Sequence, residues 1–498
     1  MVTLAEVLEG LPYRNDGGSL VQPIAGVTAD SRKVEAGYAF VAITGARADG
    51  RRFIPEAVAR GAVAIIMERS DDVALPAHIA SIVVADSRRA IAHLATAFHG
   101  HPSHQLSLIG VTGTNGKTTT TYLLEAIWRA HALTPGVIGT VTYRYGGIEY
   151  PAEQTTPGPE DLQRLLRDMV QAGVTHCAME VSSHALAQDR VWGCRFAGAL
   201  FTNLSQDHLD FHRDMQAYYA AKARLFTEYR PGIAVVNSDD PAGKTLLTEA
   251  QAPVLTYGFA PEADVRAEDV TVEAKGTHLK VRLRDQVVEI HSQLVGRHNV
   301  YNMLGVLALA TGLGWDLGRT TRGIEGLVAV PGRFERIEAG QPFCVLVDYA
   351  HTPDALRNVL TAARRLTTGR LIVVFGAGGD RDRSKRPTMG HVAAEHADLV
   401  LITSDNPRTE DPMEIIRAIE TGVRAAPRQG AYDIIEDRAQ AIHKAIALAR
   451  AGDVVVIAGK GHETYQILGA QRYPFDDRQV AREALRALGF TPEMAIQR

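Results

Sequence analysis

The sequence SLIGVTGTNGKTTTT, residues 107–121, decides the fold. Its first five residues are mostly apolar and predict a buried strand, and the apolar residues between 123 and 128 share one side of a predicted helix. A glycine-rich turn between a strand and a helix lets backbone N–H groups face phosphate oxygens, while Lys117 adds a positive charge and Thr118 a hydroxyl for Mg²⁺. The stretch therefore predicts a phosphate-binding loop, with nucleotide contacts from Gly113, Thr114, Asn115, Gly116, Lys117, Thr118 and Thr119.

The loop departs from the usual phosphate-loop spacing at one position. The usual pattern has a glycine five positions before the Gly-Lys pair, where this chain has Val111. The flanking strand and helix and the Lys-Thr pair are all present, which favours a variant phosphate loop over a glycine-rich turn that binds nothing.

Strands and helices alternate on both sides of this loop and predict an α/β protein of three domains. Residues 1–103 hold short β-rich runs, typical of a small α/β domain. In residues 104–334 the alternation predicts a central parallel sheet with helices on its faces, and alternating apolar and basic residues at 279–284 predict an antiparallel extension. A new alternation in residues 335–498 predicts a doubly wound, Rossmann-like C-terminal domain.

The composition excludes several classes of protein. Of 498 residues, 46% are hydrophobic and 22% charged, so neither a disordered nor a fibrous chain fits. The formal net charge of −4 gives no basic excess for nucleic acid, and three scattered cysteines fit neither a disulfide framework nor a cysteine-ligated zinc site. The first ten residues lack the pattern of a signal peptide, and no apolar run approaches the ~20 residues that span a bilayer. We expect a cytoplasmic monomer with small-molecule substrates and neither a nucleic-acid nor a membrane partner.

Further motifs lie in the two larger predicted domains. They are Met179-Glu180-Val181-Ser182-Ser183-His184, Asn203-Leu204-Ser205-Gln206-Asp207-His208-Leu209-Asp210, Gly296-Arg297-His298-Asn299, Pro331-Gly332-Arg333 and Asp348-Tyr349-Ala350-His351-Thr352-Pro353. With the phosphate loop and its four threonines, they resemble the Mur ligase family of ATP-dependent, amide-forming enzymes of peptidoglycan precursor synthesis. The likeness is greatest to the members that add meso-2,6-diaminopimelate to the D-glutamate of UDP-N-acetylmuramoyl-L-alanyl-D-glutamate. The resemblance implies an acyl-phosphate intermediate, ATP as co-substrate and Mg²⁺ as cofactor.

The resemblance also assigns roles to single residues around ATP. It implies that Lys117, His208 and Lys222 are catalytic, and that Mg²⁺ is held by Thr118, Glu180, His208 and Lys222, the last as a carbamate. Further ATP contacts are implied for Asn299, Arg333 and His351. Taken alone, Glu180 is equally a strand-end acid in a salt bridge, and Lys222 a solvated surface lysine. Carbamylation would exchange a cation for an anion, which suits a site that holds metal and phosphates.

The acceptor substrate is assigned to loops of the first two domains, again by resemblance. Contacts to the uridine nucleotide are implied for Ser31, Ala46, Arg47 and Ala48. Contacts to the muramoyl dipeptide are implied for Gln154, Thr155, Thr156, Ser182, Gln188 and Arg190. Gln154 stands where the family often has Asn.

The amine donor is assigned to Asp405-Asn406-Pro407-Arg408, which follows a predicted strand at 399–403. In the family this motif marks the diaminopimelate enzymes. Diaminopimelate is lysine with an additional distal carboxylate, and a guanidinium binds a carboxylate through two parallel hydrogen bonds, which is the role expected of Arg408. The remaining donor contacts are implied for Arg381, Gly459 and Glu463, with Glu463 facing the distal ammonium. Read without the family, residues 405–408 are a proline-containing turn with an exposed ion pair.

Three other functions compete with this interpretation. A lysine-adding homologue would share everything but the donor motif. A folylpolyglutamate synthase-like ligase shares the architecture and chemistry, but the acceptor residues and the motif at 405–408 argue against it. A non-enzymatic nucleotide switch predicts loss of metal and donor residues, yet Glu180, His208, Lys222, Arg408 and Glu463 are all present.

Overall fold

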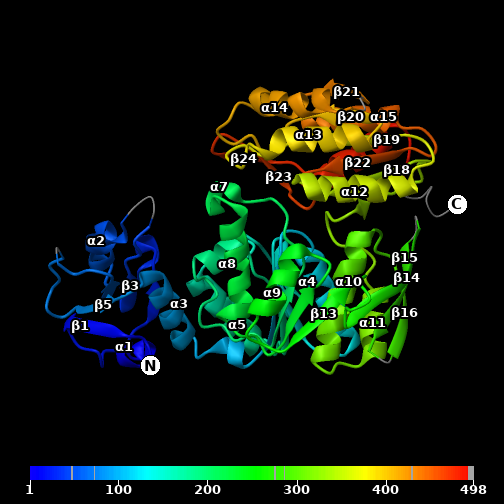
Figure 1. Cartoon of the computed structure of the whole chain (residues 1–498). Coiled ribbons are helices and arrows are strands. Elements are labelled where there is room, and N and C mark those ends of the chain that lie inside the picture. Colours follow the sequence, from blue (N-terminus) through cyan, green and yellow to red (C-terminus); the bar gives the residue numbers. More distant parts are fainter. Residues whose placement is uncertain (46–48, 72, 274–275, 285, 428–429, 492–498) are drawn as a thin grey trace.

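The computed structural model describes the chain except residues 46–48, 72, 274–275, 285, 428–429 and 492–498. Figure 1 shows three α/β units, with the N-terminal unit (blue) beside the central unit (cyan to green) and the C-terminal unit (yellow to red) above it. Within the described ranges, no helix combines the length and the apolarity that a membrane crossing needs.

The N-terminal unit is a five-stranded sheet of order β1-β5-β4-β3-β2, in which only β1 is antiparallel to its neighbour. Apolar side chains of α3, among them Ile91 and Leu94, pack against one face of this sheet. The strands are β1 Tyr13–Gly17, β2 Gly26–Thr28, β3 Tyr38–Val41, β4 Ala64–Met67 and β5 Ala80–Val84, and the helices are α1 Leu4–Leu8, α2 Ile54–Ala59 and α3 Ser87–Phe98.

The central unit is an eleven-stranded sheet of order β16-β15-β14-β13-β12-β11-β6-β10-β7-β8-β9. The strands from β14 to β7 in this order pair in parallel, and β14, β15 and β16 form the predicted antiparallel extension. The strands are β6 Ser107–Thr112, β7 Pro135–Ile138, β8 Thr142–Tyr145, β9 Ile148–Pro151, β10 His176–Glu180, β11 Gly198–Phe201, β12 Ala234–Asn237, β13 Val254–Gly258, β14 Val265–Glu273, β15 Gly276–Leu283 and β16 Gln286–Ser292.

A second antiparallel ribbon, formed by β7, β8 and β9, lies at the opposite edge of the central sheet. It was not predicted from the sequence. Strands β8 and β9 have only four residues each, which is too few to give a clear period of two.

Helices cover both faces of the central sheet. The predicted apolar side of α4, with Leu123, Leu124, Ile127 and Trp128, is buried on one face together with α10 and α11. Helices α5, α8 and α9 pack on the other face. The helices are α4 Lys117–Ala130, α5 Pro159–Gln171, α6 Ser183–Ala187, α7 Leu209–His212, α8 Met215–Thr227, α9 Pro241–Glu249, α10 Arg297–Gly312 and α11 Leu317–Glu325.

The C-terminal unit is a six-stranded sheet of order β17-β18-β22-β19-β20-β21, parallel except for β17. Helices α12, α13 and α14 cover one face and α15 and α16 the other, as a doubly wound fold requires. The elements are β17 Glu335–Arg336, β18 Cys344–Asp348, β19 Leu371–Phe375, β20 Leu399–Ile402, β21 Ala431–Ile434, β22 Val454–Ala458, α12 Pro353–Leu366, α13 Lys385–His396, α14 Pro412–Ala425, α15 Arg438–Leu448 and α16 Asp477–Ala487. A hairpin of β23 Tyr465–Leu468 and β24 Gln471–Pro474 was not predicted.

The sheets bring distant parts of the sequence together. Strands β6, β10 and β11 are parallel neighbours, so the phosphate loop, Glu180 and Asn203 follow the carboxyl ends of three adjacent strands. In open α/β sheets, this is the edge at which ligands bind. The C-terminal unit faces the same region, because residues at the start of α12 and of α10 line one cavity.

Candidate active site

A cavity of about 560 Å³ lies between the central and C-terminal units. The central unit contributes the phosphate loop, Glu180, His208 and Lys222, and the C-terminal side contributes Arg333, Tyr349, His351 and Asp354. The cavity therefore brings together most of the residues predicted around ATP and Mg²⁺.

The phosphate loop connects β6 to α4 through two glycines with positive φ. Gly113 has φ 142° and Gly116 has φ 90°. A Cβ on Gly113 would lie 1.9 Å from the Oγ1 of Thr202, so only glycine fits there. The Lys117 ammonium turns back and donates to the carbonyl oxygens of Gly113 and Thr114, both at 2.8 Å. Burial lowers the pKa of Lys117.

Glu180 is the buried carboxylate at the centre of the site. Its exposed fraction is 1%, and it ends strand β10. Thr118 donates to one carboxylate oxygen at 3.1 Å, and Thr140 donates to both oxygens, from its backbone N–H and its hydroxyl, at 2.9 Å each. From the sequence alone, Glu180 could equally have formed a local salt bridge. The described contacts include no such salt bridge, because hydroxyl and amide groups hold this carboxylate.

Lys222 is buried on α8, with an exposed fraction of 1%, so it is not a solvated surface lysine. Its ammonium donates to the carbonyl oxygen of Gly113 at 2.8 Å and lies 4.5 Å from the ring centroid of Tyr218. Burial and then the charge of Lys117 lower the pKa of Lys222 well below its usual value. The amine is therefore biased toward its neutral, nucleophilic form.

His208 lies beside Lys222 in a group of aromatic rings. Its backbone has φ 56°, and its ring packs edge-on against His184 at 4.8 Å between centroids. Burial lowers the pKa of His208 to about 3, although Asp207 opposes the shift. The imidazole is therefore neutral at physiological pH, which is the form that ligates metals.

Asp207 links the two units next to His208. Its carboxylate lies 3.6 Å from the Nε2 of His351 and 3.6 Å from the ammonium of Lys385, both in the C-terminal unit. Burial acts to raise the pKa of Asp207, but the neighbouring His351, His208 and Lys385 lower it well below its usual value. The carboxylate is therefore charged and ties the C-terminal unit to the edge of the cavity.

Arg333 reaches across to the phosphate loop. Its guanidinium donates to the hydroxyl of Thr118 at 3.0 Å and lies 4.5 Å from the ring centroid of Tyr349. The turn before it is tightly fixed, because a Cβ on Gly332 would lie 2.1 Å from the backbone nitrogen of His462. Arg333 is therefore held at the cavity rather than free in solvent.

Asn299 is not one of the described residues that line the cavity. It is buried at the start of α10, where its amide donates to the carbonyl oxygen of Val295 at 2.9 Å and accepts from Asn302 at 3.1 Å. Its neighbours His298 and Asn302 line the cavity instead. The predicted nucleotide contact of Asn299 stays a prediction.

The residues predicted to bind the acceptor fall into three places. Thr155 and Ser182 line the cavity. The other four residues predicted to contact the muramoyl dipeptide form a hydrogen-bonded network behind Glu180. In this network Arg190 donates to Gln154, to Gln188 and to the carbonyl oxygen of Thr156. Ser31 is buried in the N-terminal unit and donates to Glu56 at 2.7 Å, while Ala46, Arg47 and Ala48 lie outside the described residues.

The residues predicted to bind the amine donor gather at the carboxyl ends of β20 and β22. Asn406 donates to Glu463 at 2.8 Å, and Lys460 donates to the same carboxylate oxygen at 2.9 Å. Gly459 is close-packed, since a Cβ there would lie 2.6 Å from Asp405. The hydroxyl of Tyr349, which lines the cavity, lies 3.4 Å from Glu463 and connects this group to the nucleotide side.

Arg408 and Arg381 complete the donor group. Arg408 has φ 53°, a backbone conformation that costs a non-glycine residue about 1–2 kcal/mol, and its guanidinium donates to the carbonyl oxygen of Gly379 at 2.6 Å. Arg381 donates to the carbonyl oxygen of Asp380 at 2.9 Å. A Cβ on Gly379 would lie 1.9 Å from the carbonyl oxygen of Pro407, so this glycine lets the two loops touch.

Thr140 and Asp207 are among the site residues that were not predicted from the sequence. Thr140 holds Glu180, and Asp207 joins the units. Thr140 lies two residues after the end of β7. A sequence prediction that included β7 would therefore have placed Thr140 at the carboxyl end of a strand, where ligands bind. Asp207 lies within a quoted motif, but its partners are about 140 and 180 residues away in the sequence, which no local pattern reveals.

Three family models match: the Mur ligase family catalytic domain at 23–99, the Mur ligase middle domain at 111–310 and the Mur ligase glutamate ligase domain at 332–461. A UDP-N-acetylmuramoyl-L-alanyl-D-glutamate–2,6-diaminopimelate ligase from Geobacter metallireducens is 46% identical over 95% of this chain and 96% of its own. The enzyme of the same name from Geobacillus kaustophilus is 46% identical over 98% and 100%.

A solved structure of a protein with that name is 36% identical, with a TM-score of 0.71 over 98% of this chain and 100% of its own. The likeness thus extends over all three units. The chain belongs to the Mur ligase family.

Proposed function

We propose that this chain is an ATP-dependent ligase that joins 2,6-diaminopimelate to the D-glutamate of UDP-N-acetylmuramoyl-L-alanyl-D-glutamate, a step of peptidoglycan precursor synthesis. The observation that carries the proposal is the cavity that joins the phosphate loop, Glu180 and Lys222 to Arg333 and His351. The names of relatives 44–48% identical to the chain support the same substrates. They do not favour a folylpolyglutamate synthase or a lysine-adding enzyme.

The reaction starts from a carboxylate, which is a poor electrophile. Transfer of the γ-phosphoryl group of ATP to the D-glutamate carboxylate gives an acyl phosphate and ADP. The donor amine then attacks the acyl carbon, an amide forms, and inorganic phosphate leaves with loss of one proton. Lys117 and the backbone N–H groups at the start of α4 would hold the phosphates in line, and Arg333 would add a second positive charge from the opposite wall.

The residues around Glu180 fit Mg²⁺. A threonine hydroxyl and a carboxylate already lie 3.1 Å apart, and hard oxygen donors are the ligands that Mg²⁺ prefers. Thr118 and Glu180 would hold one ion, and His208 with carbamylated Lys222 would hold another. Bound Mg²⁺ would neutralise the charge of the phosphate oxygens. Thr140 would keep the Glu180 carboxylate aimed at the cavity.

Carbamylation explains why a lysine is buried in this position. The neutral amine of Lys222 can add to CO₂, which forms an N–C bond and releases one proton. The product carries a carboxylate in place of a cation and removes the repulsion between Lys222 and Lys117. The absence of a buried acidic partner for Lys222 among the described residues supports this proposal, since the modification would itself supply the negative charge.

Substrate recognition is divided among the three units in this proposal. We propose domains at 1–103, 104–334 and 335–498 that bind the uridine nucleotide, ATP with the muramoyl dipeptide, and the amino acid. Ser31 with residues 46–48 would contact the nucleotide, and the Gln154–Arg190 network with Thr155, Thr156, Ser182 and Gln188 the dipeptide. Arg408 and Arg381 would bind the distal carboxylate of the donor, and Glu463 its ammonium. We further propose a cytoplasmic monomer.

Release of ADP in the presence of defined substrates tests this function. The purified protein is given ATP and Mg²⁺ with UDP-N-acetylmuramoyl-L-alanyl-D-glutamate and meso-diaminopimelate, and in parallel with a folate and glutamate. We expect ADP and the UDP-tripeptide only with the first pair. ADP release with the folate pair, or no tripeptide with the first, would contradict the proposal. Lys117→Ala, which removes the phosphate-loop charge, is the inactive control.

A further inference from the structure

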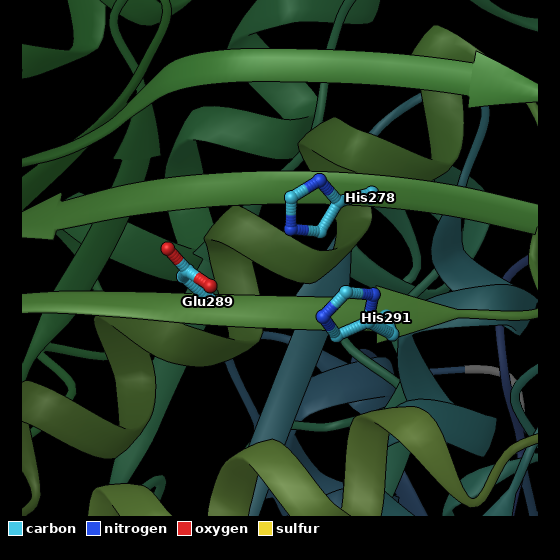
Figure 2. Close-up of side chains that lie close together, drawn as sticks. All are labelled: His278, Glu289 and His291. Atoms are coloured by element: carbon cyan, nitrogen blue, oxygen red, sulfur yellow. The ribbon is translucent and has the colours of Figure 1, made fainter.

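Two histidines and a glutamate to which no role is assigned above lie together on the antiparallel extension. Strands β15 and β16 pair so that His278 lies opposite His291 and Lys280 opposite Glu289. Alternate residues of β15, from Thr277 to Leu283, are buried, so His278, Glu289 and His291 share the outer face. Figure 2 shows the two imidazole rings and the carboxylate gathered over these two strands.

We propose that His278, Glu289 and His291 form a binding site for a divalent transition-metal ion of the Zn²⁺ type. Two imidazoles and one carboxylate are a donor set that Zn²⁺ takes readily, with a fourth position left for water. None of the three is among the described residues that line the nucleotide cavity. The site is therefore separate from the proposed Mg²⁺ site and does not depend on the proposed ligase function.

The distances suit a metal ion once the two stacked rings tilt so that a nitrogen of each points to the same ion. The two rings are stacked, with centroids 4.3 Å apart and planes 17° apart, and the candidate ligand atoms of all three residues lie within 4.8 Å of one another. Zn²⁺ bonds of about 2.0–2.2 Å place tetrahedral ligands roughly 3.3–3.5 Å apart. The remaining gap is within reach of side-chain rotation, since Glu289 is 55% exposed and His291 is also exposed.

A second observation supports a ligand. The Nε2 atom of His278 is buried and has no hydrogen-bond partner within the part of the chain that the structure describes. Buried polar atoms in native proteins are nearly always satisfied, so this nitrogen requires an explanation. A metal ion bound through it would supply the missing partner.

The positive charge of Lys280 opposes the binding of a metal ion at this site. Its ammonium lies 3.5 Å from Glu289 and 3.9 Å from Asp269. Exposed ion pairs of this kind contribute little free energy, so the carboxylate of Glu289 is available to a metal ion that two imidazoles already hold. Glu325 adds negative charge nearby, because it accepts a hydrogen bond from the backbone N–H of His291 at 2.9 Å.

Zn²⁺ titration of the full-length, metal-free protein tests the proposal. The titration is read by competition with a chromophoric chelator, in excess Mg²⁺ so that oxygen-rich sites are filled. We expect the wild type to bind one Zn²⁺ that His291→Ala and Glu289→Gln bind at least roughly tenfold more weakly. Lys280→Ala should bind as well as the wild type or better. His443→Ala, which removes an exposed histidine on α15, is the matched control and should bind like the wild type.

Absorption spectra of the Co²⁺-loaded protein and assays of ligase activity serve as controls for the titration. Co²⁺ in place of Zn²⁺ should give visible d–d absorption in the wild type and His443→Ala but not in His291→Ala. All variants should retain wild-type ligase activity, which shows that they are folded. Equal Zn²⁺ affinity of the wild type, His291→Ala and Glu289→Gln would overturn the proposal and leave the His278–His291 pair as a packing contact only.

Discussion

Lys222 combines two features that rarely occur together, complete burial and no carboxylate partner among its described contacts. Because burial lowers its pKa, the amine can react with CO₂. We expect Lys222→Ala to lose about 100-fold or more in ADP release, since it removes a proposed metal ligand. Short carboxylic acids should restore part of the activity by standing in for the carbamate, whereas bicarbonate alone should not.

The matched control is Lys244→Ala, which removes an exposed lysine on α9 and should leave turnover unchanged. Mass spectrometry under non-acidic conditions should find the carbamate on wild-type protein only. Full activity of Lys222→Ala would leave Lys222 with a packing role.

The lowered pKa of His462 predicts that the free energy of unfolding depends on pH. Burial, followed by the charge of Arg333, lowers the pKa of His462 to about 3, while an unfolded histidine titrates near 6.5. Between these values the unfolded chain binds a proton that the folded chain does not, so the free energy of unfolding decreases as the pH falls below about 6.5. Between pH 8 and pH 5 this single group accounts for up to about 2 kcal/mol.

Urea unfolding of the wild type and His462→Gln at pH 8 and pH 5 measures this contribution. The variant should lose less stability over that interval than the wild type. At pH 8 neither state protonates the ring, so the difference there reports packing alone. An equal loss in both proteins would show that His462 is not buried as described.

At the scale of the element, the turn after β7 positions Glu180. A Cβ on Gly139 would lie 2.4 Å from the Oε1 of Glu180, and Thr140 then donates twice to that carboxylate. We expect Gly139→Ala to push the carboxylate away and to lower kcat at least about tenfold, because it moves a proposed metal ligand, while the thermal midpoint stays near that of the wild type. ADP release and thermal melts measure the two effects.

Gly158→Ala is the matched control for this glycine. At Gly158 a new Cβ would meet nothing closer than 3.6 Å, so activity and stability should both be retained. Wild-type turnover of Gly139→Ala would mean that the position of Glu180 does not depend on this turn.

The regular elements around the site follow from the sequence, but the contacts between them do not. The apolar runs at 108–112, 371–375 and 454–458 predicted buried parallel strands, because strands covered on both faces are apolar throughout. The ribbon β7–β9 and the hairpin β23–β24 were missed because each of their strands has only four residues, and β9 and β24 are exposed throughout. The burial of Lys222 was equally hidden, since nothing in its helix distinguishes it from a surface lysine.

Where the site residues are of common types, their roles could be predicted only from the resemblance to the family. The phosphate loop and Arg408 could be argued from chemistry alone, because glycine, lysine and arginine in those contexts suit phosphate and carboxylate. Ser31, Gln188 and Thr156 could not, since such residues form ordinary turns and caps. Asn299 is buried at the start of α10 and bonded to Val295 and Asn302, so its nucleotide contact stays a prediction that rests on the resemblance alone.

At the scale of the whole molecule, the site exists only where two units meet. Asn115 donates to Asp354 at 3.2 Å, Gln206 donates to Asp382 at 3.2 Å, and Asp207 lies between His351 and Lys385. ATP is bound mainly by the central unit and the donor by the C-terminal unit in our proposal. Donor choice therefore requires both units.

The choice between meso-diaminopimelate and L-lysine is the most direct test of that claim. With lysine in the site, Arg408 would lose its carboxylate partner, and a site built around a polar group rejects an analogue that lacks it by about 10⁴-fold. We predict that kcat/KM for meso-diaminopimelate exceeds that for lysine by roughly this factor. Arg408→Ala should remove most of the preference by losing diaminopimelate rather than by gaining lysine, and Arg417→Ala, an exposed arginine on α14, should keep it. Use of both donors within about tenfold by the wild type, or unchanged diaminopimelate turnover in Arg408→Ala, would contradict the account.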